Sequence, residues 1–305
     1  MTLAERAERA RGSVAPASYI AAPVLERAGG TGVVRGADTG VVRAAGTGIV
    51  RGAGRAAAYV DFDGFVVALT APGVALMPNG IAVGIHPDEL EWARRGARVS
   101  AAPGRLGDVG WDAECPPVWE ARLCLGLCAR GADVRARGAA ILAACGVEPE
   151  ADPVALAGSV GARGVGDDPK AMALLLGSVG GRDPVRAAAA GELLVGRGPG
   201  LTPEGDDLVA ATAGVVSALG SWSESERRAW REAVLGCGLR SCTTSLSATL
   251  IELAAAGDVI EPVHGLFGGG EGTWRAALRR LLGIGGSTGA AYAVAAGAAA
   301  FLGAA

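Results

Sequence analysis

The chain of 305 residues is poor in lysine, histidine and aromatic side chains. It holds one lysine, Lys170, two histidines and 4% aromatic residues, whereas it holds 64 alanines and 50 glycines. The two histidines, His86 and His264, are too few and too isolated to form a histidine metal site. Because most of the apolar side chains are small, we expect helices that pack closely through Leu, Val and Ala rather than through rings.

Positive charge is also scarce. The net charge is −3, every basic residue except Lys170 is an arginine, and no basic stripe runs along the sequence. A protein that binds nucleic acid needs concentrated positive charge to displace counterions from the phosphates. The composition therefore argues against a nucleic-acid partner.

Long hydrophobic runs are absent as well. The most apolar stretch, residues 289–305, is mostly Ala and Gly, and residues 1–11 lack the apolar core of a signal peptide. We therefore expect a cytoplasmic protein that does not bind membranes. In that compartment the six cysteines would be reduced, and we expect most of them to be buried as small apolar side chains.

Two regions of different character predict an α+β protein. Residues 1–112 contain short β-rich runs, including a hairpin signal at Asp63 and Gly64, and a short helix is expected near 86–95. Residues 113–305 show helical patterns separated by Gly, Pro, Asp or Ser. We predict a mostly antiparallel β-domain over 1–112, followed by an all-helical domain over 113–305.

The helical region divides into nine expected segments. The first is a long pattern over 118–145, broken near Gly131. The others are 153–160, 168–179, 184–195, 204–219, 223–238, 243–256, 273–282 and 288–302.

A repeat with a period of eight residues occupies residues 31–51. Units of Thr-Gly followed by two β-branched residues and Arg begin at Thr31, Thr39 and Thr47. A unit of this length is too short for a solenoid repeat. The repeat predicts either a small β-meander or, as the preferred interpretation, a duplicated low-complexity insertion in an exposed hairpin.

The segment GRGPGLTPEGDD, residues 196–207, is the strongest candidate site. Its three glycines in five residues allow close backbone approach and positive φ angles. Thr202 is a favourable N-cap and Pro203 suits the first helical position, so a helix is expected to start here. The free N–H groups at such a start can bind an anion.

Capping does not explain the end of this segment. Gly205 stands inside the expected helix, where a helix former would be more stable, and two adjacent carboxylates follow it. A small residue there would let a ligand approach, and Asp206 or Asp207 could hold a metal or a substrate amide, or act as a general base. The alternative is a well-capped helix after a glycine-rich turn, and the spacing alone does not choose between the two.

Two further segments combine hydroxyls or glycines with a helix start. In SCTTSLS, residues 241–247, the hydroxyls of Thr243 or Thr244 and of Ser247 fall on one helical face and could donate to an oxyanion. In GIGGSTG, residues 283–289, glycines and hydroxyls again precede a helix. Capping and close helix packing are the alternative explanation for both segments.

These three segments resemble a bacterial family that includes the AllH-type subunit of oxamate carbamoyltransferase. The resemblance covers about residues 49–303, and its most specific part is GxGPGLTPxGDD at 196–207. Supporting parts are Pro78-Asn79 in the β-region, Thr243-Thr244-x-x-Ser247 and the glycine segment before Gly289. Glu204 departs from the family pattern, in which a small hydroxyl residue is usual.

The resemblance implies an enzyme of several subunits that moves a carbamoyl group between phosphate and oxamate, in the breakdown of allantoin. A small carbamoyl- or carboxylate-bearing ligand would suit donors at helix starts. The chain is then either an enzyme or enzyme subunit for such a metabolite, or a non-catalytic ligand-binding or scaffolding subunit. Hetero-oligomers with other carbamoyltransferase-type subunits, or homo-oligomers, are the expected assemblies.

We predict that the three segments line one pocket, with Asn79 from the β-region at its rim. Asp206 and Asp207 are the predicted catalytic residues. No cofactor is expected, and a divalent metal at this pair of carboxylates is the single metal candidate. The predicted ligand-binding residues are Asn79, Arg197, Gly198, Gly200, Leu201, Thr202, Gly205, Thr243, Thr244, Ser247, Ser287, Thr288 and Gly289.

Overall fold

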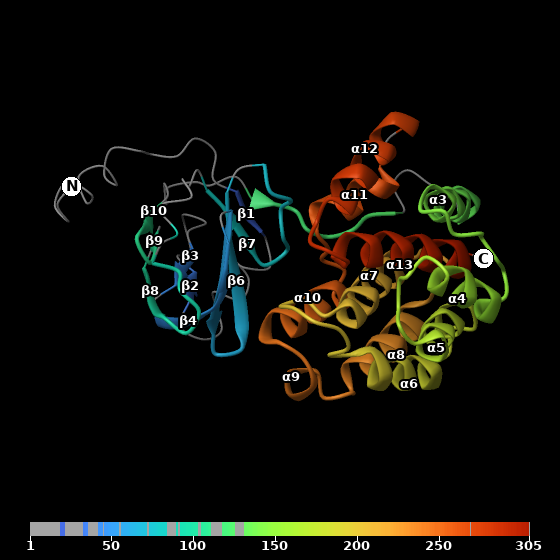
Figure 1. Cartoon of the computed structure of the whole chain (residues 1–305), viewed down its shortest axis with the longest axis horizontal. Coiled ribbons are helices and arrows are strands. Elements are labelled where there is room, and N and C mark those ends of the chain that lie inside the picture. Colours follow the sequence, from blue (N-terminus) through green and yellow to red (C-terminus); the bar gives the residue numbers. More distant parts are fainter. Residues whose placement is uncertain are drawn as a thin grey trace. The chain divides into compact units, whose positions relative to one another are not determined.

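The computed structural model of the chain forms two compact units, Met1–Ala121 and Arg122–Ala305 (Figure 1). It describes residues 19–21, 33–35, 42–44, 46–54, 56–71, 73–83, 90, 92–102, 105–110, 118–125, 131–268 and 270–304. The first unit contains a β-sheet and the second contains helices, so the predicted α+β class is confirmed.

The first unit contains a nine-stranded sheet with the order β10-β9-β8-β4-β5-β6-β7-β1-β11. Neighbouring strands run antiparallel, except for the parallel pairs β6–β7 and β1–β11. The strands are β1 (Tyr19–Ala21), β4 (Gly46–Ala53), β5 (Ala57–Phe62), β6 (Phe65–Thr70), β7 (Gly80–Ala82), β8 (Arg98–Ala102), β9 (Arg105–Leu106), β10 (Val109–Gly110) and β11 (Val118–Trp119).

The predicted hairpin joins β5 and β6. Asp63 and Gly64 form its two-residue turn with φ angles of 51° and 90°, and two positive φ angles are what a type I′ turn requires. Asp61, at the end of β5, accepts a hydrogen bond of 2.6 Å from the Gly64 N–H and one of 2.8 Å from Arg51 Nε. Val60 and Leu69 point into the core of the sheet and are fully buried.

The period-eight repeat is divided between two sheets. Its first two units contain β2 (Val33–Arg35) and β3 (Val42–Ala44), which pair with each other in a separate two-stranded sheet. The third unit lies in β4, between β5 and β8, and its Val50 is fully buried. An exposed insertion therefore does not describe the third unit, because a buried side chain anchors it in the main sheet. Most of the helix expected near 86–95 lies outside the described residues.

The long helix expected from Val118 is wrong in its first part. Val118 and Trp119 form β11, which pairs with β1, and the described residues 118–125 contain no helix, whereas α3 covers Gly131–Ala144. Pairing defines this strand, because Val118 lies opposite Ile20 and Trp119 lies opposite Ala21 in the neighbouring β1. The chain continues extended into the second unit, where the Leu123 N–H donates to the Gly257 carbonyl at 2.8 Å.

The second unit is built around α13, which runs through the middle of the helices in Figure 1. Nearly all of its side chains are buried, and α3 and α7 pack beside it. The helices are α3 (Gly131–Ala144), α4 (Pro153–Gly161), α5 (Pro169–Gly180), α6 (Pro184–Leu194), α7 (Glu204–Ala218), α8 (Glu224–Leu235), α9 (Leu239–Cys242), α10 (Ser245–Ala255), α11 (Glu261–Phe267), α12 (Glu271–Leu282) and α13 (Thr288–Gly303).

Small residues bring these helices together, as predicted. A Cβ on Gly138 of α3 would lie 2.5 Å from the Phe301 nitrogen and 2.6 Å from the Gly297 oxygen of α13, so only glycine permits this contact. Rings contribute more than the composition suggests, since Trp230 and Trp274 are the largest fully buried side chains. Close backbone contact and a few large rings therefore share the packing.

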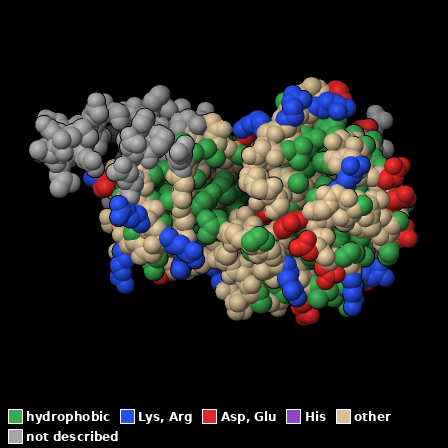
Figure 2. Space-filling model, in the orientation of Figure 1, with side chains coloured by type: hydrophobic (Ala, Val, Ile, Leu, Met, Phe, Trp, Pro, Cys, Tyr) green, Lys and Arg blue, Asp and Glu red, His purple; other side chains and the backbone are tan. Residues whose placement is uncertain are grey.

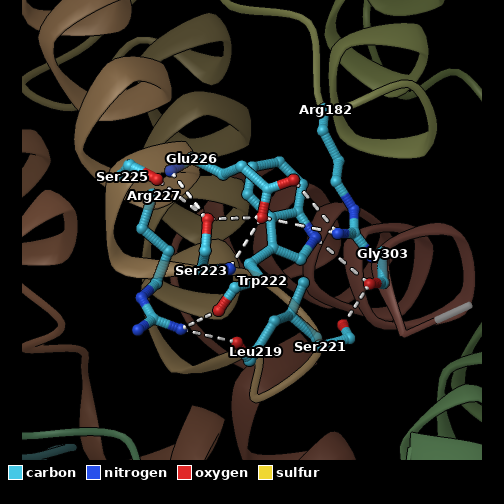
Figure 3. Close-up of polar contacts among 9 residues, drawn as sticks. All are labelled: Arg182, Leu219, Ser221, Trp222, Ser223, Ser225, Glu226, Arg227 and Gly303. Atoms are coloured by element: carbon cyan, nitrogen blue, oxygen red, sulfur yellow. Dashed lines mark hydrogen bonds and ion pairs between the residues drawn. The ribbon is translucent and has the colours of Figure 1, made fainter.

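The connection from α7 to α8 holds the end of α13 (Figure 3). Ser221 Oγ and Trp222 Nε1 both donate to the Gly303 carbonyl, at 2.8 and 3.2 Å. Ser223 then starts α8 with a capping box, in which Glu226 accepts from the Ser223 N–H at 2.7 Å. Polar contacts thus fasten the C-terminal end of the central helix.

Three expectations from the composition can be compared with the described residues. Figure 2 shows basic side chains scattered over the visible face of the described residues, without a single stripe. No helix in the described part of the chain has the length and apolar character that crossing a membrane requires. The expectation of buried cysteines is wrong for the four that are described, since Cys124 and Cys242 are exposed and Cys145 and Cys237 are half-buried.

Candidate functional site

The three glycine and hydroxyl segments meet at the start of α7. Thr202 Oγ1 lies 3.2 Å from Thr288 Oγ1, which joins the first segment to the third. Thr244 Oγ1 donates to the Leu201 carbonyl at 2.6 Å, which joins the first segment to the second. The three predicted segments therefore contact one another within the helical unit, and the pocket that they were predicted to line stays a prediction.

Asn79, the fourth predicted contributor, belongs to the sheet unit. Its side chain is fully buried, and its Nδ2 donates to the Val66 carbonyl at 2.9 Å. This contact fixes the turn before β7. Its role at the rim of the pocket stays a prediction.

Asp206 lies below the glycine loop and holds it in place. The side chain is 1% exposed, and its two oxygens accept from the Gly196 N–H at 2.7 Å and from the Thr243 hydroxyl. Burial raises the pKa of Asp206, while the hydrogen bonds from Thr243, Gly196 and Ser247 act in the opposite direction. Both oxygens are occupied by contacts within the protein, so Asp206 positions the loop.

Asp207 differs from Asp206, because one of its two carboxyl oxygens has no hydrogen-bond partner among the described residues. The side chain is 2% exposed, and its Oδ2 is buried with no hydrogen-bond partner among the described residues. Burial raises the pKa of Asp207 to about 8, the Thr288 hydroxyl lowers it, and the charges of Asp206 and Glu204 raise it further. A buried polar atom without a partner costs free energy, which makes this oxygen the best candidate for contact with a ligand.

A short chain of hydroxyls connects Asp207 to the loop. The Thr288 hydroxyl lowers the pKa of Asp207 and also lies 3.2 Å from the Thr202 hydroxyl, a contact in which either oxygen can be the donor. The pair of threonines, from α13 and from the loop before α7, therefore orients the Asp207 carboxyl.

Residues 194–301 match the family model of oxamate carbamoyltransferase subunit AllH. This match confirms the resemblance to the AllH family over residues 194–301, which contain all three segments that build the site. The comparisons with curated proteins and with solved structures found no match. We call residues 194–301 the AllH region.

One residue of the AllH region that the sequence analysis missed is Tyr292. It lies one helical turn after Thr288 in α13 and is buried. Burial raises the pKa of Tyr292 well above its usual range, and the charges of Asp207 and Asp206 add to this effect. Its spacing of four residues from Thr288 could have indicated that both side chains face the same neighbour.

The cap expected at Thr202 is wrong. The N-cap of α7 is Pro203, which offers no side-chain hydrogen bond, and the helix begins at Glu204. The Thr202 hydroxyl contacts Thr288 instead, because the glycine loop turns it toward α13. The unusual Glu204 of this AllH region points elsewhere, since its Oε1 accepts from the Gly166 N–H at 2.6 Å.

Packing explains two glycines that were predicted to contact the ligand. A Cβ on Gly205 would lie 2.0 Å from the Leu194 carbonyl oxygen at the end of α6. A Cβ on Gly289 would lie 1.9 Å from the Leu281 carbonyl oxygen at the end of α12. Both helix starts therefore rest directly on the backbone of a preceding helix, and each contact requires glycine.

The remaining predicted residues divide into an exposed group and a group that fastens the loop. Arg197, Gly198, Gly200 and Ser287 are exposed, and Gly198 and Gly200 have φ angles of 113° and 103°. Arg197 Nε donates back to the Leu193 carbonyl at 3.2 Å. Leu201, Thr244 and Ser247 fasten the loop to the start of α10, where Thr244 accepts from the Ser247 N–H at 3.1 Å.

The described residues offer no cluster of further ligands to the divalent metal that was predicted at the two carboxylates. No group of three His, Cys, Asp or Glu side chains gathers within the described residues. A divalent metal at Asp206 and Asp207 therefore stays a prediction.

Proposed function

We propose that the chain is a subunit of an oxamate carbamoyltransferase-type enzyme, and that its Asp207 site takes the carbamoyl- or amide-bearing metabolite. The observation that carries this proposal is the buried Oδ2 of Asp207, which has no partner among the described residues, beside three convergent helix starts. The AllH match over these same segments supports the reaction class.

The reaction transfers a carbamoyl group from phosphate to an amide nitrogen. The nitrogen of oxamate attacks the carbamoyl carbon, a C–N bond forms, and the C–O bond to phosphate breaks as phosphate leaves with the electron pair. The nitrogen must also lose a proton. In our proposal the ionised carboxylate of Asp207 accepts that proton at Oδ2 and passes it to the phosphate or to water.

The electrostatics of Asp207 suit such a base. A general base works best when its pKa lies near the pH at which the enzyme operates, and burial raises the pKa of Asp207 to about 8. Its neighbour Asp206 is assigned a positioning role, because the Gly196 N–H and the Thr243 hydroxyl already occupy its oxygens. The exposed glycine loop would supply N–H donors for the anionic part of the metabolite.

The test replaces Asp207 with Asn and measures phosphate release from carbamoyl phosphate and oxamate, in the complex with the partner subunits. We expect the rate to fall by about 10²–10⁴-fold, the range typical of a lost general base, while oxamate binding measured by calorimetry is retained. Asp183→Asn is the matched control, because Asp183 is also an acid at a helix start, with Oδ1 accepting backbone N–H bonds. A rate of Asp207→Asn within threefold of the parent would contradict the proposal.

A non-catalytic ligand-binding or scaffolding subunit is the second candidate. This candidate is favoured by the contacts of Asp206, because both of its oxygens accept hydrogen bonds that hold the glycine loop in place. In that case oxamate would raise the melting temperature of the chain by mass action, and Asp207→Asn would abolish this shift without changing the turnover of the partner subunits.

A further inference from the structure

A polar cavity lies at the end of α7 opposite to the Asp207 site. It has a volume of about 100 Å³, and its polar lining consists of Arg122, Ser217, Glu224, Arg227 and Arg231. Ser217 follows Asp207 by ten residues along the helix, which separates the two places by about 15 Å. The cavity is therefore distinct from the Asp207 site.

Arg227 is the best-anchored arginine of this cavity. Its Nη1 donates to the carbonyls of Leu219 and Trp222, at 2.9 and 2.6 Å (Figure 3). Its Nε and Nη2 contact Glu224, at 3.2 and 3.1 Å. Glu224 therefore balances the charge of Arg227, and one N–H of Nη2 remains available.

The other two arginines differ in their contacts. Arg231 lies one turn after Arg227 on α8 and makes no hydrogen bond or ion pair with any residue that the structure describes. Arg122 Nε lies 3.9 Å from Asp258 Oδ1, which is a long ion pair. Like charges one turn apart on a helix repel each other, and Arg122 brings a third positive charge to the same space.

The nearby helix ends explain only part of this arrangement. The C-terminal carbonyls of α7 and α10 border the cavity, and arginine is stabilising at such ends. Arg227 plays this role through the Leu219 carbonyl. Arg231 makes no contact of this kind with the described residues, so the helix ends do not account for it.

We propose that this cavity binds a phosphate-type oxyanion between Arg122, Arg227 and Arg231. Guanidinium groups present planar pairs of N–H donors that match the oxygens of phosphate, and three of them suit an anion with at least three oxygens. The volume holds a few waters or one small ion. Binding would give Arg231 a charged partner and fasten the extended segment at Arg122 to α7 and α8.

The test titrates the full chain with inorganic phosphate in calorimetry. We expect Arg231→Gln and Arg122→Gln each to weaken this binding by about tenfold or more, since a hydrogen bond to a charged group contributes at least that factor. Arg228→Gln is the matched control: Arg228 also lies on α8 and is exposed, but it pairs with Glu232 at 2.7 Å outside the cavity. Phosphate that binds at the Asp207 site as a reaction product would be unaffected by Arg231→Gln or Arg122→Gln, so a loss in these two variants reports on the cavity independently of the proposed function.

Two results would overturn the proposal. One is phosphate affinity in both cavity variants equal to that of the parent, and the other is an equal loss in Arg228→Gln, which would indicate a general effect of charge. A parallel titration with glycerol 3-phosphate distinguishes the two sources of the oxyanion. Equal affinity for both probes assigns the site to the phosphate end of a metabolite, whereas binding of inorganic phosphate alone assigns it to the free ion.

Discussion

The helices of the second unit begin in two different ways. Helices α4, α5 and α6 start with Asp-Pro, and the side chains of Asp152, Asp168 and Asp183 accept hydrogen bonds from the first N–H groups. Helices α7 and α13 start after glycine loops and have no side-chain cap. Their carboxyl and hydroxyl groups instead contact neighbouring helix starts.

This difference separates stability from function. An Asp at the N-cap stabilises its own helix while it stays near the solvent. Asp206 and Asp207 lie inside the first turn of α7 and are buried, where an ionised carboxylate is costly unless donors surround it. Asp206 has those donors, whereas Asp207 lacks a partner for one oxygen. A cost of this kind, kept at one helix start, is typical of a functional site.

The largest expected effect concerns the pH dependence of stability. Asp207 has a pKa of about 8 in the folded chain and an ordinary value near 3.8 when unfolded, so between these values the folded state holds a proton that the unfolded state has released. The free energy of unfolding should then fall as the pH rises from about 4 to about 8, by up to about 1.4 kcal/mol per pH unit.

Asp207→Asn removes the titrating carboxyl, so the folded and unfolded states of the variant no longer differ by a proton at this position. Urea denaturation followed by circular dichroism should show a shallower pH dependence in the variant than in the parent, and a more stable variant at pH 8. Identical slopes for the two proteins would mean that Asp207 ionises in the folded state as it does in water.

The next effect tests the close contact below the α7 start. Gly205→Ala would place a methyl group 2.0 Å from the Leu194 carbonyl oxygen, and we expect a loss of about 3 kcal/mol in the free energy of unfolding. Gly158→Ala in α4 is the matched control, because nothing lies within 4 Å of its Cβ position. This variant should be more stable by about 0.5–1 kcal/mol. Equal changes in the free energy of unfolding for the two variants would show that the start of α7 has no special requirement for glycine.

Most helices could be predicted because Pro, Gly and Asp mark their ends in the sequence. From residue 153 onward the eight expected segments correspond to α4, α5, α6, α7, α8, α10, α12 and α13. Helices α9 and α11 were missed because they have four and seven residues, too few for a clear period. Strand β11 was missed because two residues carry no pattern, and only pairing with β1 defines the strand.

The candidate site was predictable in its location but not in the roles of its members. Glycines and hydroxyls at three helix starts indicated the convergence. That Asp206 is occupied by Gly196 and Thr243, while Asp207 keeps an oxygen without a partner among the described residues, depends on tertiary contacts that no spacing reveals. The same holds for Gly205, whose need for glycine comes from a carbonyl eleven positions away in the chain.

A smaller effect is expected at the capped helix starts. Asp168→Ala removes the acceptor of the Lys170 and Ala171 N–H groups, which it binds at 2.9 and 3.1 Å. We expect a loss of about 1 kcal/mol in the free energy of unfolding, with no change in oxamate binding, because this cap serves only α5. A clear loss of oxamate affinity would show that the capped starts also contribute to the site.

The smallest effect on stability is expected for Ser287→Ala at the start of α13. Ser287 occupies the N-cap position, where alanine usually costs about 1 kcal/mol, but here its side chain makes no capping bond and is exposed. The free energy of unfolding should therefore change by less than about 0.5 kcal/mol, the range of a surface substitution. If the uncapped start serves a ligand, oxamate affinity measured by calorimetry should fall by about threefold or more, since an exposed hydroxyl donor would be lost. A stability loss as large as that of Asp168→Ala, with unchanged oxamate affinity, would contradict this prediction. It would show that α13 begins with an ordinary cap and belongs with α4, α5 and α6.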